Sequence, residues 1–194
     1  MTHISPLNFV HKSGKFGDYK GKKESNLLKV SEVNRSLIFQ IAKFKNSKFD
    51  ISKLKIDDLN LPSTLKSSSN SNTRILWLGP DNWLVFSSNL DLITKENKQF
   101  NGEDFAITNI SHSRTIIELE GNLVNEVLKK GCPLDINTLK EGDCANSVYN
   151  GITVTIDFIS DKPKKVRILG LRSFGESLYH SITDACLEFG YKAV

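Results

Sequence analysis

Residues 109–135, NISHSRTIIELEGNLVNEVLKKGCPLD, contain a strand, a turn, a helix and the signal that ends the helix. Residues 115–119 (TIIEL) are rich in β-branched side chains, which favour a short strand. Apolar residues then recur at helical spacing over residues 122–130. Gly131 suits the position just past a helix, and Pro133 cannot continue one. This stretch therefore predicts a domain in which strands and helices are mixed.

The residues that precede this stretch predict strands and short helices in the order β-α-β-β-α-β. The hairpin is the clearest of these features, because Pro80, Asp81 and Asn82 form a turn signal between two apolar runs. That order of elements is typical of ferredoxin-like units. The expected elements are a strand at 34–44, a helix at 51–58, strands at 74–79 and 83–87, a helix at 90–97 and a strand at 105–110.

From residue 111 onward the pattern is β-α-β-β-β-α. Asn150 and Gly151 predict a tight hairpin turn, and Ser173 with Glu176 has the spacing of a capping box before the last helix. We therefore predict an α+β protein with two ferredoxin-like βαββαβ-type subdomains packed together. The expected elements are a strand at 114–119, a helix at 122–130, strands at 144–149, 152–158 and 165–169, and a helix at 172–189.

Charge and composition divide the chain into an arm and two subdomains. Residues 1–30 carry the whole net charge of +4, so the remaining chain is neutral. We predict a basic, flexible N-terminal arm over 1–30, a first subdomain over 31–110 and a second over 111–194. The Ser- and Asn-rich residues 62–73 predict a mobile loop. The arm is either a solvated tail or linker, or an extended segment laid across nucleic acid or an acidic protein surface.

Several classes of protein are disfavoured by what the sequence lacks. Neither a dinucleotide-binding nor a P-loop glycine pattern occurs. The three cysteines form no CxxC pair, which argues against a disulfide framework or a structural zinc site and favours a reducing compartment. No apolar run is long enough to span a membrane, and the neutral body lacks basic-aromatic interleaving. We expect a cytoplasmic protein with no nucleic acid and no membrane among its partners.

Three residues are candidates for a subunit interface. His112 lies between two serines, but neighbours in an extended chain point to opposite faces, so we favour a structural role over acid-base chemistry or metal binding. Arg114 and Arg172 lie at element edges, where a guanidinium either is solvated or holds a carboxylate across an interface. We expect no catalytic, cofactor-binding or metal-binding residue in this chain.

The chain resembles the gamma subunit family of heterotetrameric sarcosine oxidases over roughly residues 34–190. The blocks occur in the order found in that family, with compatible gaps between them. The residues that carry the resemblance are 76–84 (LWLGPDNWL), 110–115 (ISHSRT), 131–135 (GCPLD), Cys144-Ala145, and 172–174 (RSF) at the start of the last helix.

The resemblance implies a partner-bound subunit. It implies a complex that oxidatively demethylates sarcosine to glycine, makes hydrogen peroxide, and passes the one-carbon unit to tetrahydrofolate or releases formaldehyde. FAD, FMN and NAD are implied for the alpha and beta subunits, with tetrahydrofolate also bound outside this chain. A gamma subunit of this kind has no known catalytic residue and contacts chiefly alpha, within a complex that includes beta and delta. Its fold is similar to the N-terminal region of aminomethyltransferases, the glycine cleavage T-proteins.

Two further interpretations remain open. In the first, the chain is the equivalent subunit of N-methylglutamate dehydrogenase or of another secondary-amine demethylase. In the second, it is a stand-alone folate-binding one-carbon protein. Length disfavours the stand-alone protein, because full aminomethyltransferases have further domains.

Overall fold

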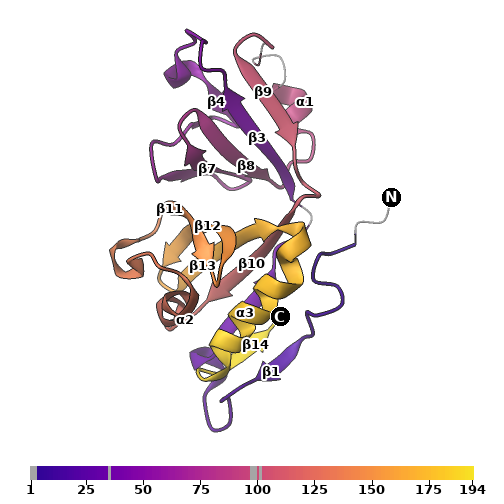
Figure 1. The fold of residues 1–194 in the computed structure, drawn as a ribbon, viewed down its shortest axis with the longest axis vertical. Helices are drawn as coiled ribbons and strands as arrows, with labels where there is room; N and C mark the ends of the chain where they lie inside the picture. Colours follow the sequence, from indigo (N-terminus) through magenta and orange to yellow (C-terminus); the bar gives the residue numbers. More distant parts are fainter. Residues whose placement is uncertain (1–3, 35, 97–99, 101) are drawn as a thin grey trace. The chain divides into compact units, whose positions relative to one another are not determined.

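The computed structural model describes residues 4–34, 36–96, 100 and 102–194, and it divides the chain into two compact units. We call residues 1–34 together with 113–194 the terminal unit, and residues 35–112 the middle unit. Both units contain more strand than helix (Figure 1). The predicted α+β class is confirmed, whereas the ferredoxin-like description of the subdomains is not. No described helix is both long enough and apolar enough to cross a membrane.

The terminal unit is built on a seven-stranded sheet with β10 at its centre. Strand β10 pairs antiparallel with β2 on one side and with β13 on the other. The pair β2–β14 is parallel and joins the two ends of the chain. In sheet order the strands are β1 (Gly14–Phe16), β14 (Tyr191–Ala193), β2 (Leu28–Glu32), β10 (Arg114–Glu120), β13 (Lys164–Leu171), β12 (Ile152–Asp161) and β11 (Cys144–Tyr149).

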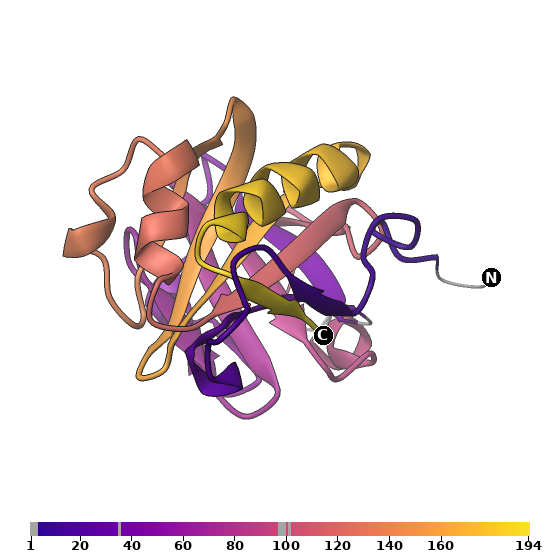
Figure 2. The ribbon, with the colours of Figure 1, turned by 90° about the horizontal axis from the view of Figure 1, so that it is seen from below.

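Helices α2 (Val124–Gly131) and α3 (Gly175–Leu187) lie against one face of this sheet (Figure 2). The core between them includes Ile117 and Leu119 of β10, Val124 of α2 and Leu178 of α3. Because successive strand residues point to opposite faces, the alternating polar residues of β10 lie on the other side of the sheet. We call that side the outer face. Short 3₁₀ helices over Glu24–Asn26, Ile136–Thr138 and Arg172–Phe174 complete the unit.

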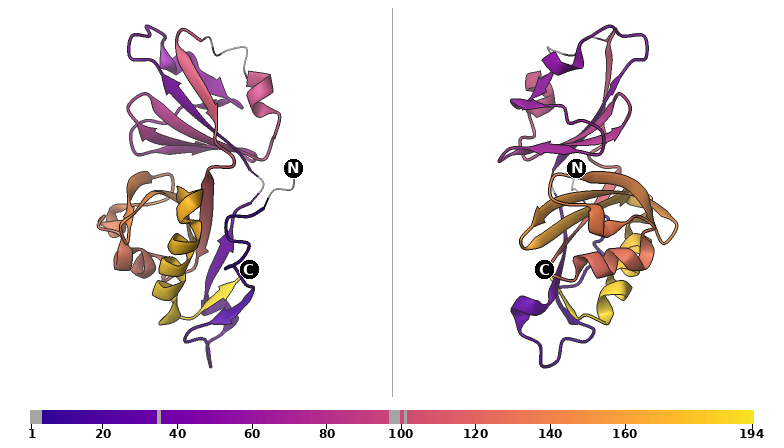
Figure 3. Two further views of the ribbon diagram at one scale, coloured as in Figure 1. Left: turned by 45° about the vertical axis from the view of Figure 1, so that its right-hand side comes forward. Right: turned by 90° about the vertical axis from the view of Figure 1, so that its left-hand side faces the viewer.

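Over residues 4–30 the structure differs from the flexible arm that we predicted for residues 1–30, while residues 1–3 lie outside the described residues. Residues 14–16 and 28–32 form β1 and β2, which lie beside β14 in the sheet (Figure 3). Leu7, Leu28 and Val30 are buried. The sequence signal was weak because Lys29, Ser31 and Glu32 leave only two apolar residues in this strand of five. The hydrogen-bonding partners of β2 lie far along the chain, where a local pattern cannot show them.

The middle unit contains a five-stranded sheet and a short two-stranded ribbon. One face of the larger sheet packs on a second core that includes Phe39, Ile75, Val85 and Leu54. In sheet order the larger sheet has β6 (Ser67–Ser69), β7 (Thr73–Gly79), β8 (Asn82–Ser87), β3 (Leu37–Lys43) and β9 (Phe105–Asn109), and the ribbon has β4 (Lys55–Ile56) and β5 (Leu59–Asn60). The unit also has the 3₁₀ helix Ile51–Lys53 and helix α1 (Leu92–Glu96).

The helix predicted at 51–58 is wrong. A 3₁₀ turn over Ile51–Lys53 leads instead into the β4–β5 ribbon. Asp57 and Asp58 at its turn have φ values of 51° and 65°, a left-handed conformation that ends any helix. The Asp57 carboxylate accepts a hydrogen bond from the Thr73 hydroxyl at 2.6 Å, which ties the turn to β7. The apolar spacing at 51–59 therefore reflects two short extended segments that share one core.

Other local predictions have mixed outcomes. Both hairpins are confirmed, with φ values of 56° at Asp81 and 46° at Asn150 in their turns. Residues 62–73, predicted to be a mobile loop, include strand β6 paired with β7. The predicted capping box is wrong, because Phe174 is the N-cap of α3 and makes no side-chain capping bond. Residue 97 of the helix predicted at 90–97 lies outside the described residues.

Glycine substitutions test whether the N-terminal segment is docked. Gly17 and Gly21 both have positive φ, but a Cβ at Gly17 would lie 2.2 Å from the Leu187 carbonyl oxygen, whereas a Cβ at Gly21 would meet nothing within 4 Å. We expect Gly21→Ala to lower the free energy of unfolding by about 1 kcal/mol from backbone strain. We expect Gly17→Ala to cost a further ~1–3 kcal/mol, because the segment must move away from α3. Urea unfolding measures both, and equal effects would contradict the docked segment.

Candidate functional site

The described residues offer little conventional active-site chemistry. Within the described ranges, no group of three or more His, Cys, Asp or Glu side chains is placed to hold a metal ion. Cys132, Cys144 and Cys186 are buried, and none of the three forms a disulfide. Burial raises the pKa of the Cys186 thiol to about 12, so this side chain stays protonated and unreactive near neutral pH. The cysteines are therefore core residues.

The structure brings Arg114 and Arg172 to the same end of the terminal sheet. Arg114 lies opposite Leu171 in the β10–β13 register, and the Arg172 N–H donates to the Ser113 carbonyl at 2.9 Å. Their side chains have different surroundings. The Arg172 guanidinium donates to the Ile4 carbonyl at 2.5 Å, while alternation along β10 places Arg114 on the outer face. His112 is exposed and belongs to the middle unit.

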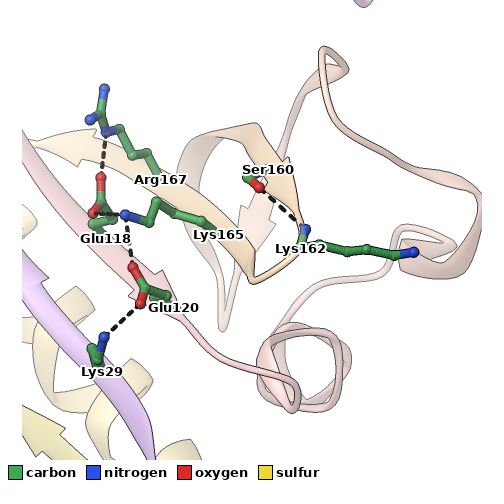
Figure 4. A network of polar contacts seen from close by, with 7 residues as sticks. All are labelled: Lys29, Glu118, Glu120, Ser160, Lys162, Lys165 and Arg167. Atoms are coloured by element: carbon green, nitrogen blue, oxygen red, sulfur yellow. Dashed lines mark hydrogen bonds and ion pairs between the residues drawn. The ribbon is translucent and has the colours of Figure 1, made fainter. Parts of the chain in front are cut away.

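Opposite charges alternate across the strands of the outer face. Glu118 and Glu120 of β10 lie between Lys29 of β2 and the cations Lys165 and Arg167 of β13 (Figure 4). The closest contacts are Arg167–Glu118 at 2.9 Å, Lys165–Glu120 at 2.7 Å and Lys29–Glu120 at 2.7 Å. At the neighbouring β12–β13 turn the Lys162 N–H donates to the Ser160 hydroxyl at 3.2 Å (Figure 4).

These contacts fix the charge states of the outer face. Hydrogen bonds from Lys165 and then Lys29 lower the pKa of Glu120, and the Glu120 contact raises the pKa of Lys165. At the sheet edge, Lys192 and Lys15 both contact Glu24 and lower its pKa to about 2, with the Lys192 hydrogen bond the larger cause. Glu120 and Glu24 are therefore held as carboxylates near neutral pH, each in contact with two lysines.

Arg114 lies on this face at the end of β10. Its side chain is half-buried, and burial lowers the pKa of its guanidinium. Leu171, directly opposite, is 42% exposed although it is apolar. The sequence identified Arg114 from its place at a strand edge, but its surroundings could be found only from the fold.

The middle unit contains a pocket that sequence reasoning missed. Its volume is about 590 Å³, within the range of small-ligand pockets. Trp77 and Trp83 line it beside Pro62 and Pro80, and the two tryptophans are cross-strand neighbours. The Trp83 indole N–H donates to the Pro62 carbonyl at 3.0 Å, which holds one wall in place. The sequence places a tryptophan on each side of a turn, and this pattern could have indicated the pocket. We interpreted it only as a hairpin.

Solved structures define the class of the fold. The chain is similar to a chain of the heterotetrameric sarcosine oxidase from Corynebacterium sp. U-96, in complex with pyrrole 2-carboxylate, with a TM-score of 0.79 and 22% identity over 96% of this chain and 95% of that chain. It is also similar to the glycine cleavage system aminomethyltransferase T from Bartonella henselae, with a TM-score of 0.64 and 12% identity over 88% of this chain and 48% of that chain. The fold is therefore α+β of the aminomethyltransferase type.

Sequence comparison shows the particular family. Residues 45–188 match the family described as "Sarcosine oxidase, gamma subunit family", and the chain belongs to this family. Among curated relatives, the sarcosine oxidase subunit gamma of Corynebacterium sp. (strain U-96) is 31% identical over 125 residues, 61% of this chain and 58% of the relative. That of Arthrobacter sp. is 33% identical over 128 residues, 63% of this chain and 61% of the relative. The chain thus spans about three fifths of the length of these relatives.

The ion pairs of the outer face give a testable contribution to stability. We expect Glu120→Gln to lower the free energy of unfolding at pH 7 by about 1 kcal/mol, because Glu120 joins two lysines in a network. Since the folded state lowers the pKa of Glu120 below its ordinary 4.5, this stabilisation is present above pH 4.5 and is lost as pH falls through the folded pKa. Urea unfolding at pH 7 and pH 3 checks both statements.

Glu126→Gln is the matched control for that experiment. Among the described residues Glu126 pairs only with Lys129, three residues along α2, and its side chain is 48% exposed against 20% for Glu120. A helical pair of this kind contributes about 0.3 kcal/mol. Equal losses at pH 7, or an undiminished Glu120→Gln effect at pH 3, would contradict a stabilising network on the outer face.

Proposed function

We propose that this chain is the non-catalytic gamma subunit of a heterotetrameric sarcosine oxidase. In this role it supports the oxidative demethylation of sarcosine to glycine, with transfer of the one-carbon unit to tetrahydrofolate by the complex. The match of residues 45–188 to the gamma subunit family carries the proposal. The likeness of fold to a chain of a heterotetrameric sarcosine oxidase, over nearly the full length of both chains, supports it.

The chain contributes surface and shape to the complex, while the chemistry belongs to its partners. Alpha is the chief partner, with beta and delta in the same assembly, and FAD, FMN, NAD and tetrahydrofolate bind to those subunits. A rigid outer face suits this role, because a preorganised surface loses little conformational freedom on binding. The buried cysteines, none of which forms a disulfide, support a reducing compartment, and we place the complex in the cytoplasm.

Co-production with its partner subunits tests the proposal. The chain is expressed with candidate alpha, beta and delta subunits from the same source, and the complex is recovered through a tag on this chain. We expect a yellow complex that forms hydrogen peroxide when sarcosine is added. The chain purified alone is expected to be colourless and inactive on sarcosine, because the flavins belong to the partner subunits.

The other outcomes identify the alternatives. A yellow complex that is inactive on sarcosine but oxidises another N-methyl amino acid would replace sarcosine oxidase with a related secondary-amine demethylase. Recovery of a lone chain that binds tetrahydrofolate would favour a stand-alone one-carbon protein. Sarcosine turnover by the lone chain would contradict a non-catalytic role.

A further inference from the structure

The pocket of the middle unit has no part in the proposed function. Residues of two segments, 51–64 and 77–83, form it, so every residue that lines it belongs to the middle unit. At about 590 Å³ it has the size of a pocket for a small organic molecule. Its apolar lining consists of Ile51, Leu61, Pro62, Trp77, Pro80 and Trp83.

Hydrogen bonds hold the two walls of this pocket in place. The Trp83 indole N–H donates to the Pro62 carbonyl at 3.0 Å, which ties strand β8 to the segment that follows β5. The Lys43 N–H donates to the Asp81 carbonyl at 2.9 Å, which ties the hairpin turn to β3. A pocket whose walls are fixed before binding loses little conformational freedom when a ligand enters.

The charge of the pocket comes from Asp81. Among the residues that line it, all of them in the described part of the chain, Asp81 has the only charged side chain, and there is no Lys, Arg or His. Asp81 is exposed at the hairpin turn, where a ligand can reach its carboxylate from water. An anionic ligand would meet this carboxylate with no lining cation to offset the repulsion. The charge therefore favours a cationic ligand.

The two tryptophans favour the same ligand charge. An indole ring attracts a cation that lies over its face, and it does so more strongly than the ring of Tyr or Phe. Trp77 and Trp83 are cross-strand neighbours, and both line the pocket. An ammonium group with alkyl substituents suits these walls, because it combines a positive charge with an apolar surface. A metal ion or a bare ammonium would lose more hydration against apolar walls.

We propose that this pocket binds a small organic monocation with an alkylated ammonium head. The head lies against Trp77 and Trp83 and within reach of the Asp81 carboxylate, while the apolar part of the ligand contacts Leu61 and Pro62. This site does not depend on the gamma subunit assignment, which is tested by assembly. Loss of either proposal would leave the other standing.

Tryptophan fluorescence reports on this pocket alone, because Trp77 and Trp83 are the only tryptophans of the chain. The purified chain is titrated at constant ionic strength with choline, and separately with 3,3-dimethyl-1-butanol, which has the same shape but a carbon in place of the charged nitrogen. We expect choline to change the emission saturably and the alcohol to bind about 5- to 30-fold more weakly. Equal affinities, or no saturable change with choline, would overturn the proposal.

A matched pair of aspartate variants tests the charge. Asp81 and Asp58 are both exposed and both have positive φ in a turn, but only Asp81 lines the pocket. Asparagine also adopts this conformation, so Asp81→Asn and Asp58→Asn each remove one charge with little backbone strain. We expect Asp81→Asn to raise the dissociation constant of choline about two- to fivefold and Asp58→Asn to leave it unchanged. Equal effects of the two variants would show that Asp81 has no specific role and would contradict the site.

Two variants of Trp77 test the aromatic wall, with Trp83 kept as the fluorescent reporter. We expect Trp77→Leu to raise the dissociation constant of choline about 5- to 20-fold, and Trp77→Phe to raise it less, because phenylalanine retains a weaker aromatic face. Unchanged affinity in Trp77→Leu, or the same loss in both variants, would overturn the aromatic contact. Melting temperatures show which variants are folded. If Trp77→Leu is unfolded, the comparison of Asp81→Asn with Asp58→Asn decides the question, because neither changes a buried group.

Discussion

Strand β10 is hydrogen-bonded along both edges, and this double pairing fixes the arrangement of the terminal unit. On one side it pairs antiparallel with β13, and the sheet continues from β13 through β12 to β11. On the other side it pairs with β2, which in turn pairs with β14 in parallel. A parallel pair needs a long connection, and here nearly the whole chain lies between its two strands. The unit therefore forms only when both ends of the chain are in place.

The alternation of side chains along β10 gives the sheet two different faces. Ile117 and Leu119 are buried beneath the helices, while Glu118 and Glu120 lie among lysines and an arginine on the outer face. The inner face stabilises the fold through the hydrophobic effect, which far exceeds the contribution of any surface ion pair. The outer face instead provides an ordered pattern of charge. Arg114 lies at one end of that pattern, opposite the exposed Leu171.

Local patterns predicted the elements whose signals lie within a few residues. Strand β10, helix α2 and both hairpins were expected from β-branched runs, apolar spacing and turn residues. Strands β2 and β14 were missed because their pairing depends on residues far apart in the sequence. The helix predicted at 51–58 was wrong because left-handed aspartates turn the chain there. Arg114 was a candidate from its position alone, and its place on the outer face appears only from the fold.

The measurement that tests this account most directly is hydrogen exchange of the backbone amides of β2 in the isolated chain. If β2 is an interior strand between β10 and β14, its hydrogen-bonded amides open with the sheet, and we predict protection comparable to that of β10. Exchange of β2 at the rate of an unstructured chain, while β10 remains protected, would contradict the account. Residues 1–30 would then be a free basic arm, and β14 would lack β2, the strand with which it pairs.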